Sequence, residues 1–231
     1  MKLSTVTALD EAMAARRPVA FAKRLSDAAE FILPDPAAPE ALNAAGAEVL
    51  AADRSETRTI GEETWFIEAR NPAPRLMLIG AVHIAQALAP LGGMMGFTVQ
   101  LVDPRRGFAN QERFPGIEIV NEWPDAALQT LRPDSTTAVV ALAHDPKIDD
   151  PALDQALRSE AFYIGALGSR KSHAARCERL GALGHENAAL QRIRGPVGLD
   201  IGAVSAPEIA LSVIAEIVAV RRRGRLGIRT T

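Results

Sequence analysis

The chain of 231 residues lacks several features that mark particular classes of protein. It has one cysteine, Cys177, so an internal disulfide and a zinc site built from several cysteines are both excluded. No apolar run approaches the roughly 20 residues that cross a bilayer, so we expect no membrane-spanning helix. The formal net charge of −2 gives no electrostatic reason to expect nucleic acid or an anionic membrane as a partner.

The amino terminus, from Met1 to Thr7, has no hydrophobic segment of the kind that directs secretion. We therefore expect a cytoplasmic protein. Hydrophobic residues make up 48% of the chain and charged residues 23%, which is ordinary for a globular protein. The length is sufficient for one large domain or two small ones, each with its own core.

The clearest break in the chain is Asn71-Pro72-Ala73-Pro74, because two prolines in four residues disfavour helix and remove backbone donors. We expect a small α+β domain over residues 1–71 and a second domain over residues 75–231. Within the first, the pattern predicts helices at 9–15 and 39–51, a strand at 18–23 and a hairpin over 57–68.

After the break, apolar strands alternate with helices. Strands are predicted at 76–79, 97–102, 116–120, 136–143 and 161–165. Helices are predicted at 84–95, 125–131, 151–159, 170–183 and 208–222. Ser205 and Glu208 form a capping box at the start of the last helix. Continuously apolar strands separated by helices predict a Rossmann-like, doubly wound α/β domain with a mainly parallel sheet.

The first predicted strand of this domain runs into a glycine turn, Gly80-Ala81-Val82-His83, and then into a helix. Such a turn directs backbone N–H groups and the positive end of a helix dipole at one point, which favours phosphate binding. Val82 stands where a dinucleotide fingerprint has its second glycine. Its branched side chain narrows the approach and disfavours a positive φ, so we expect a ligand other than a standard dinucleotide.

Asp103 ends the next predicted strand, near the usual spacing for a carboxylate that binds ribose. Arg105 and Arg106 follow it and offer a phosphate partner instead. These residues keep an NAD(P) site open as an alternative.

A loop follows the most apolar predicted strand and contains His144 and Asp145. Functional loops of open α/β sheets lie at this end of the strands. His144 is a candidate base, proton carrier or hydrogen-bond donor to an anion, and the alternative is a polar residue that ends the strand.

A second glycine turn contains Gly165, Gly168, Ser169 and Arg170. Ser169 would cap the following helix. The cations at positions 170 and 171 oppose the helix dipole unless an anion compensates them, which indicates an anion site. Farther on, Asp200 lies in a glycine-rich loop over residues 195–202 and is a candidate ligand-facing carboxylate.

From Arg75 to Arg222 the chain resembles the carboxyl-terminal Rossmann domain of the XdhC/CoxI family, which are accessory factors of molybdenum hydroxylases such as xanthine dehydrogenase. Several motifs in the same order carry the resemblance. They are Gly80 to Ala85, Asp103-Pro104-Arg105, Arg113-Phe114-Pro115, Ala143-His144-Asp145, Tyr163 to Arg170, Pro196 to Gly202 and Pro207 to Ser212.

The resemblance implies a chaperone that binds molybdenum cofactor (molybdopterin), assists its maturation and delivers it to a molybdenum hydroxylase, with a sulfur donor as a further partner. The sequence has no Walker loop, metalloprotease motif or nucleophile elbow, which favours a binding protein over an enzyme. An NAD(P)-dependent oxidoreductase and a ligand-free scaffold that binds the hydroxylase are the alternatives. The resemblance is compatible with a homodimer.

The predicted cofactor site has no metal ligands and no catalytic residues. Its members are Gly80, Ala81, Val82, His83, Asp103, Arg105, His144, Asp145, Gly165, Gly168, Ser169, Arg170 and Asp200.

Overall fold

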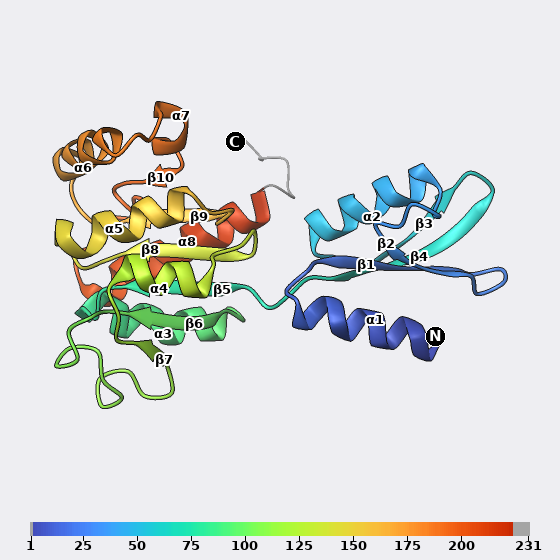
Figure 1. Ribbon diagram of the computed structural model, residues 1–231, viewed down its shortest axis with the longest axis horizontal. Helices are drawn as coiled ribbons and strands as arrows, with labels where there is room; N and C mark the ends of the chain where they lie inside the picture. Colours follow the sequence, from blue (N-terminus) through green and yellow to red (C-terminus); the bar gives the residue numbers. More distant parts are fainter. Residues whose placement is uncertain (1, 224–231) are drawn as a thin grey trace. The chain divides into compact units, whose positions relative to one another are not determined.

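The computed structural model describes residues 2–223 and separates into two compact units (Figure 1). The second unit is Ala73–Arg221, and the first contains the residues up to Pro72 together with Arg222 and Arg223. The first unit is a four-stranded antiparallel sheet with strand order β2-β1-β4-β3 and two helices. Its elements are α1 (Leu3–Ala14), β1 (Val19–Arg24), β2 (Glu30–Leu33), α2 (Glu40–Ala52), β3 (Glu56–Ile60) and β4 (Glu63–Arg70).

Alternation along β1 explains how both faces of this sheet are covered. Ala20 and Ala22 pack in the cluster beneath α2, whereas Val19 and Phe21 pack with α1. Since successive side chains of a strand point to opposite faces, the two helices cover opposite faces of the sheet. The predicted hairpin is confirmed, with Gly61 at its turn and a φ of 61°. Strand β2 was not predicted, because only four residues form it and three of them are half-buried.

The second unit contains a six-stranded sheet with strand order β10-β9-β8-β5-β6-β7, and every neighbouring pair is parallel. The predicted Rossmann-like fold is therefore confirmed. Its elements are β5 (Arg75–Ile79), α3 (His83–Met94), β6 (Thr98–Val102), β7 (Glu118–Val120), α4 (Pro124–Leu131), β8 (Thr137–Ala141), α5 (Pro146–Leu157), β9 (Tyr163–Ala166), α6 (Arg170–Ala182), α7 (Asn187–Leu190), β10 (Ile193–Arg194) and α8 (Ala206–Arg223).

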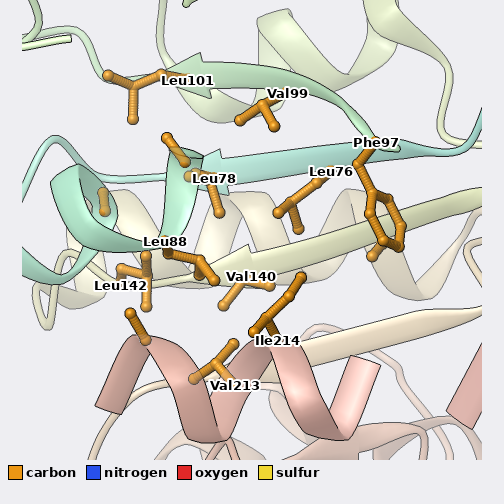
Figure 2. Packing of buried hydrophobic residues seen from close by; sticks show 14 of the residues in the cluster. Leu76, Leu78, Leu88, Phe97, Val99, Leu101, Val140, Leu142, Val213 and Ile214 are labelled. Atoms are coloured by element: carbon orange, nitrogen blue, oxygen red, sulfur yellow. The ribbon is translucent and has the colours of Figure 1, made fainter. Parts of the chain in front are cut away.

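The core of this unit has two layers because β5 and β8 are buried on both faces. Leu76, Leu78 and Val140 pack on one face with Leu88 of α3 and Val213 of α8, as Figure 2 shows. On the other face, alternate residues of the same strands pack with α4, α5 and α6. Every residue of β5 and β8 is buried, which explains why these strands read as continuous apolar runs.

Two predicted boundaries differ from the structure in an informative way. Helix α5 begins at Pro146 rather than at residue 151, because the side chain of Asp145 caps it and accepts from the N–H of Lys147 at 3.0 Å. Proline suits the first position of a helix, where its missing N–H costs no hydrogen bond. The predicted strand over 116–120 is shorter and contains only Glu118–Val120.

Strand order determines where a ligand can bind. The chain passes from β5 outward to β6 and β7, then returns to β8 on the other side of β5 and continues to β9 and β10. The order therefore reverses between β5 and β8. In open α/β sheets, ligands bind outside the carboxyl ends of the strands at such a switch point.

Candidate functional site

A pocket of about 440 Å³ lies at this switch point. Three loops form its walls, and each follows the carboxyl end of a neighbouring strand: β5, β8 and β9. We call this pocket the crevice. It is lined by Val82, His83, Ile84, Leu142, Ala143, His144, Leu167 and Gly168.

Gly80 brings the first two walls together. Its φ is 104°, a conformation that other residues rarely adopt. A β-carbon at this position would lie 2.7 Å from the backbone nitrogen of Ala143 and 2.8 Å from its α-carbon. The loops after β5 and β8 can therefore approach each other this closely only if residue 80 is glycine.

Val82 is compatible with the turn, and the expectation that its position needs a positive φ is wrong. Its φ is −99° and its ψ is 171°, so the backbone is extended and a branched side chain fits. The residue is the N-cap of α3 and has no side-chain oxygen to accept from the first-turn N–H groups. Those N–H groups are thus available to an anion.

Asp103 lies beneath this turn and not at the rim of the crevice, where we expected a ribose-binding carboxylate. The side chain is fully buried. One oxygen accepts from the N–H of Ala81 at 2.7 Å and from Nη2 of Arg105 at 2.7 Å, and the other accepts from the N–H and Nε of Arg105, each at 2.9 Å. Burial acts to raise the pKa of Asp103, but these hydrogen bonds outweigh it and the pKa lies below its usual value. Asp103 therefore positions the turn.

A neighbouring pocket of about 420 Å³ shares Val82 and His83 with the crevice and adds Arg105, Phe108 and Arg113. Arg113 donates to the carbonyl oxygens of Ala81 at 3.0 Å and Phe108 at 2.8 Å, which ties the loop after β6 to the glycine turn. Neither Phe108 nor Arg113 was among the predicted site residues, although Arg113 belongs to one of the motifs that carry the family resemblance.

The loop after β8 places His144 on the crevice. His144 is exposed and has a φ of 59°. Beside it, Asp145 is committed to capping α5 and does not line the crevice. Asp149, one turn into α5, accepts from the N–H of Ala143 at 3.1 Å and holds the loop from below.

The residues of the second glycine turn have different roles: some support the structure, and others are accessible to a ligand. Gly165 is buried within β9, and a β-carbon there would lie 2.6 Å from Cγ2 of Val197, so its role is packing. Gly168 has a φ of 137° and lines the crevice. Ser169 caps α6 by accepting from the N–H of Ser172 at 3.2 Å. Arg170 is exposed and forms no ion pair within residues 2–223.

Asp200 and Arg170 line a third pocket of about 470 Å³, which shares Leu167 and Gly168 with the crevice. The glycine-rich loop of this pocket is anchored by Glu216 of α8. One carboxylate oxygen of Glu216 accepts from the hydroxyl of Tyr163 at 2.5 Å and from the N–H of Gly198 at 3.0 Å. Sequence reasoning missed Glu216, because nothing in a helical apolar pattern shows that one carboxylate faces a loop.

The second unit matches the family model described as the XdhC Rossmann domain over residues 76–217. The chain belongs to the XdhC family. The XdhC Rossmann domain is thus the part that contains the crevice, both glycine turns and the Asp200 loop.

Several known proteins are similar to this XdhC family member. It is 34% identical over 167 residues to the molybdenum cofactor insertion chaperone PaoD of Escherichia coli (strain K12), covering 72% of this chain and 46% of PaoD. It is 33% identical over 159 residues to a probable xanthine dehydrogenase subunit of Bacillus subtilis (strain 168), covering 68% of this chain and 46% of that protein. The chain thus spans less than half the length of these curated relatives.

A solved structure has the same fold. A crystal structure described as a xanthine dehydrogenase from Bacillus halodurans superimposes with a TM-score of 0.71 at 24% identity. The match covers 95% of this chain and 67% of that one, so it includes both units of the XdhC family member.

Residues 2–223 contain neither a candidate metal site nor a candidate membrane-spanning helix. No group of three or more His, Cys, Asp or Glu side chains there is arranged to hold a metal ion. None of the helices in that range combines the length and apolar character needed to cross a membrane.

Cys177 lies half-buried on α6, and burial raises the pKa of its thiol.

Proposed function

We propose that this chain binds molybdenum cofactor in the crevice and passes it to a molybdenum hydroxylase. The observation that carries the proposal is the uncapped start of α3, set at the switch point of the sheet by Gly80 and by the buried carboxylate of Asp103. The similarity to the chaperone PaoD supports the choice of cargo.

The crevice suits a ligand that combines a phosphate with a fused ring, as molybdopterin does. The free N–H groups at the start of α3 offer donors to a phosphate, and Arg170 at the opposite turn is a cation without an ion pair in the described part of the chain. The walls between them are largely apolar. Among the residues that line the crevice there is no nucleophile paired with a base, which fits a protein that holds its ligand without transforming it.

The alternative, an NAD(P)-dependent oxidoreductase, has less support. Both carboxylate oxygens of Asp103 are occupied by Ala81 and Arg105, so neither is free for a ribose hydroxyl. A dinucleotide bound in the usual Rossmann manner would lose that contact. The choice between the two ligands is testable directly.

A titration of the purified chain with molybdopterin, NAD and NADP by anaerobic calorimetry tests the proposal. We expect saturable binding of molybdopterin and no binding of either nucleotide at the same concentrations. Micromolar binding of NAD without binding of molybdopterin would overturn the proposal. Delivery is tested by mixing the loaded chain with a cofactor-free hydroxylase, whose activity should rise as cofactor is transferred.

The role of the second turn is tested with Arg170→Ala. If Arg170 makes a charge-assisted hydrogen bond to the ligand, its loss should weaken binding by about 1.5–3 kcal/mol. Arg54→Ala is the matched control, since the Arg54 side chain is 79% exposed in the other unit. Equal affinities for both variants would remove the second turn from the site.

A further inference from the structure

The pocket beside the crevice contains two arginines, and we call it the arginine pocket. Arg105 and Arg113 line it from the loop after β6, and Val82 and His83 line it from the start of α3. Its volume is about 420 Å³. Because Val82 and His83 also line the crevice, a ligand bound in the crevice can extend into the arginine pocket.

The side chain of Arg113 is held by neutral groups. Its Nη1 donates to the carbonyl oxygens of Ala81 and Phe108, and its Nη2 donates to Oε1 of Gln86 at 3.1 Å. Its guanidinium lies 5.9 Å from the ring centroid of Phe108 and 5.5 Å from that of Phe114. Within residues 2–223 it forms no ion pair. The positive charge of Arg113 is therefore fixed in position without being neutralised.

Arg105 is held in a different way. Its Nε and Nη2 donate to the carboxylate of Asp103, and its guanidinium lies 4.9 Å from the ring centroid of Phe108. Nη1 of Arg105 and Nε of Arg113 make no hydrogen bond to a described residue, and neither is among the buried polar atoms without a partner. Both donors are thus accessible from outside the chain.

These charges determine which ligand fits. Two guanidinium groups face one carboxylate, that of Asp103, so one positive charge is left over. The lining of the arginine pocket contains no Asp or Glu, so an anion placed there meets no like charge among these residues. A guanidinium binds a phosphate well, because its planar N–H groups match several phosphate oxygens at once. Since the two guanidinium groups are already held in place, binding orders few side chains.

We propose that the arginine pocket binds the phosphate group of the cargo, with Arg113 and Arg105 as its cationic ligands. The inference rests on the proposed function, because molybdopterin carries a phosphate monoester beside its fused rings. The phosphate then lies on the β6 side of the first glycine turn, and the rings lie in the crevice. Arg170, at the opposite turn, contacts the ring end of the cargo in this orientation.

The test compares molybdopterin with the same compound after alkaline phosphatase has removed its phosphate, by anaerobic calorimetry on the full chain. Because hydrogen bonds between charged groups are at stake, we expect intact molybdopterin to bind about tenfold tighter or more. Arg113→Met removes the guanidinium but keeps an apolar chain beside the two rings. We expect this variant to lose the preference for the intact compound and to bind the dephosphorylated one as the unaltered chain does. A purely structural role of Arg113 would weaken the binding of both compounds equally.

Lys147→Met is the matched control, because it also removes one positive charge. Lys147 is exposed at the start of α5 and lines none of the three pockets described, so this variant should keep the preference. Melting temperature and far-ultraviolet circular dichroism establish that both variants are folded. Arg105 is left unaltered, since its removal would leave the buried carboxylate of Asp103 without its cation.

The unaltered chain alone can refute the proposal, because equal affinities for the two compounds would overturn it. A preference that survives in Arg113→Met, or that falls as far in Lys147→Met, would also overturn it. So would a preference that is lost in Arg170→Ala but not in Arg113→Met.

These failures are distinct from failure of the proposed function. If molybdopterin binds equally well with and without its phosphate, only the placement of the phosphate is wrong. The absence of molybdopterin binding would refute the proposed function itself.

Discussion

At the scale of single residues, the crevice depends on side chains and backbone conformations that hold its walls in place. Gly80 permits the close approach of the loops after β5 and β8. Asp103 binds the glycine turn from beneath, and Asp149 does the same for the His144 loop. The walls of the crevice, which include the side chains of His83 and His144, are thus held in position by buried carboxylates.

We predict that Gly80→Ala destabilises the chain by about 1–3 kcal/mol or more, because the β-carbon would combine strain at φ 104° with overlap against Ala143. Gly93→Ala is the matched control. Gly93 lies in α3 with open space around it, so alanine should stabilise the chain by about 0.5–1 kcal/mol. Urea unfolding measures both changes, and a similar change in stability for the two variants would contradict this account of Gly80.

Because of Asp149, we predict an unusual pH dependence of the free energy of unfolding. Burial raises its pKa from 3.8 to about 6 in the folded chain, against the attraction of Arg176 and backbone N–H groups. Between pH 3.8 and about pH 6, the Asp149 carboxyl is more often protonated in the folded chain than in the unfolded chain. The contribution of Asp149 to the free energy of unfolding therefore falls as the pH rises through this range and is constant at higher pH. Relative to Asp149→Asn, the unaltered chain should lose about 2–3 kcal/mol of unfolding free energy between pH 4 and pH 6.5.

Chemical unfolding of both proteins across that range is the measurement. Other carboxylates, such as Asp103 and Asp154, have lowered pKa values and make the opposite contribution, but they are present in both proteins. The difference between the two curves therefore isolates Asp149. A difference that does not vary with pH would show that folding does not raise the pKa of Asp149.

At the scale of elements, several loops that follow strands of the parallel sheet are anchored by a neighbouring element. The clearest case is the loop over residues 195–202. Glu216 of α8 accepts from both Tyr163 of β9 and the N–H of Gly198, so strand, loop and helix are joined at one carboxylate. Burial and Glu216 both raise the pKa of Tyr163 above its usual value, so its hydroxyl remains a hydrogen-bond donor even in alkaline solution.

We predict that Tyr163→Phe loosens this loop. The variant removes a hydrogen bond to a charged group, which should cost about 1.5–3 kcal/mol of stability. It should also speed hydrogen exchange at the amide of Gly198, because the carboxylate that holds this amide loses its other buried partner. The amide of Ala81, bonded to Asp103, is the internal reference. Unchanged protection at Gly198 would show that the loop is held by other contacts.

Elements could be predicted from the sequence where burial on both faces produced a long apolar run, as in β5 and β8. The two-residue strand β10 and the single-turn helix α7 were not predicted, since such short segments have no measurable period. The early start of α5 depends on a capping bond from Asp145, and the sequence did not distinguish this role from ligand binding.

The sequence indicated where in the fold the candidate site lies, but it did not indicate the role of each residue in it. Glycine turns and strand-end loops indicated which edge of the sheet to expect, and the structure brings Val82, His83, His144 and Gly168 together there. The role of Asp103 could not be predicted, because it depends on the direction in which Arg105 folds back. Asp149 and Arg176 were missed since nothing in two isolated helical residues shows that they meet in the interior.

At the scale of the whole molecule, the fold divides into a small antiparallel unit and a larger parallel one, each with its own core. All the pockets described here lie in the larger unit. The elements that build the crevice pack among themselves, so the larger unit has a core of its own and contains the whole proposed site.

We predict that a fragment of residues 73–223 folds cooperatively and binds the same ligand within about threefold of the full chain, a difference below about 0.7 kcal/mol. Circular dichroism, a melting curve and the same calorimetric titration test this. A fragment that folds but has lost its affinity would show that the smaller unit contributes to binding. Residues 2–72 are the complementary fragment for a folding comparison.

Val82, which occupies the N-cap position of α3 without capping it, has a thermodynamic consequence. A serine or aspartate in its place would typically make a helix start more stable by about 0.5–2 kcal/mol, so the free chain forgoes that stability at the very point where an anion would dock. Under the proposed function, an anionic cargo would act as the missing cap, and its departure would return the helix to its less stable form. A partner that supplied its own acceptor to these N–H groups as the cargo left would make release easier, without any movement of the sheet.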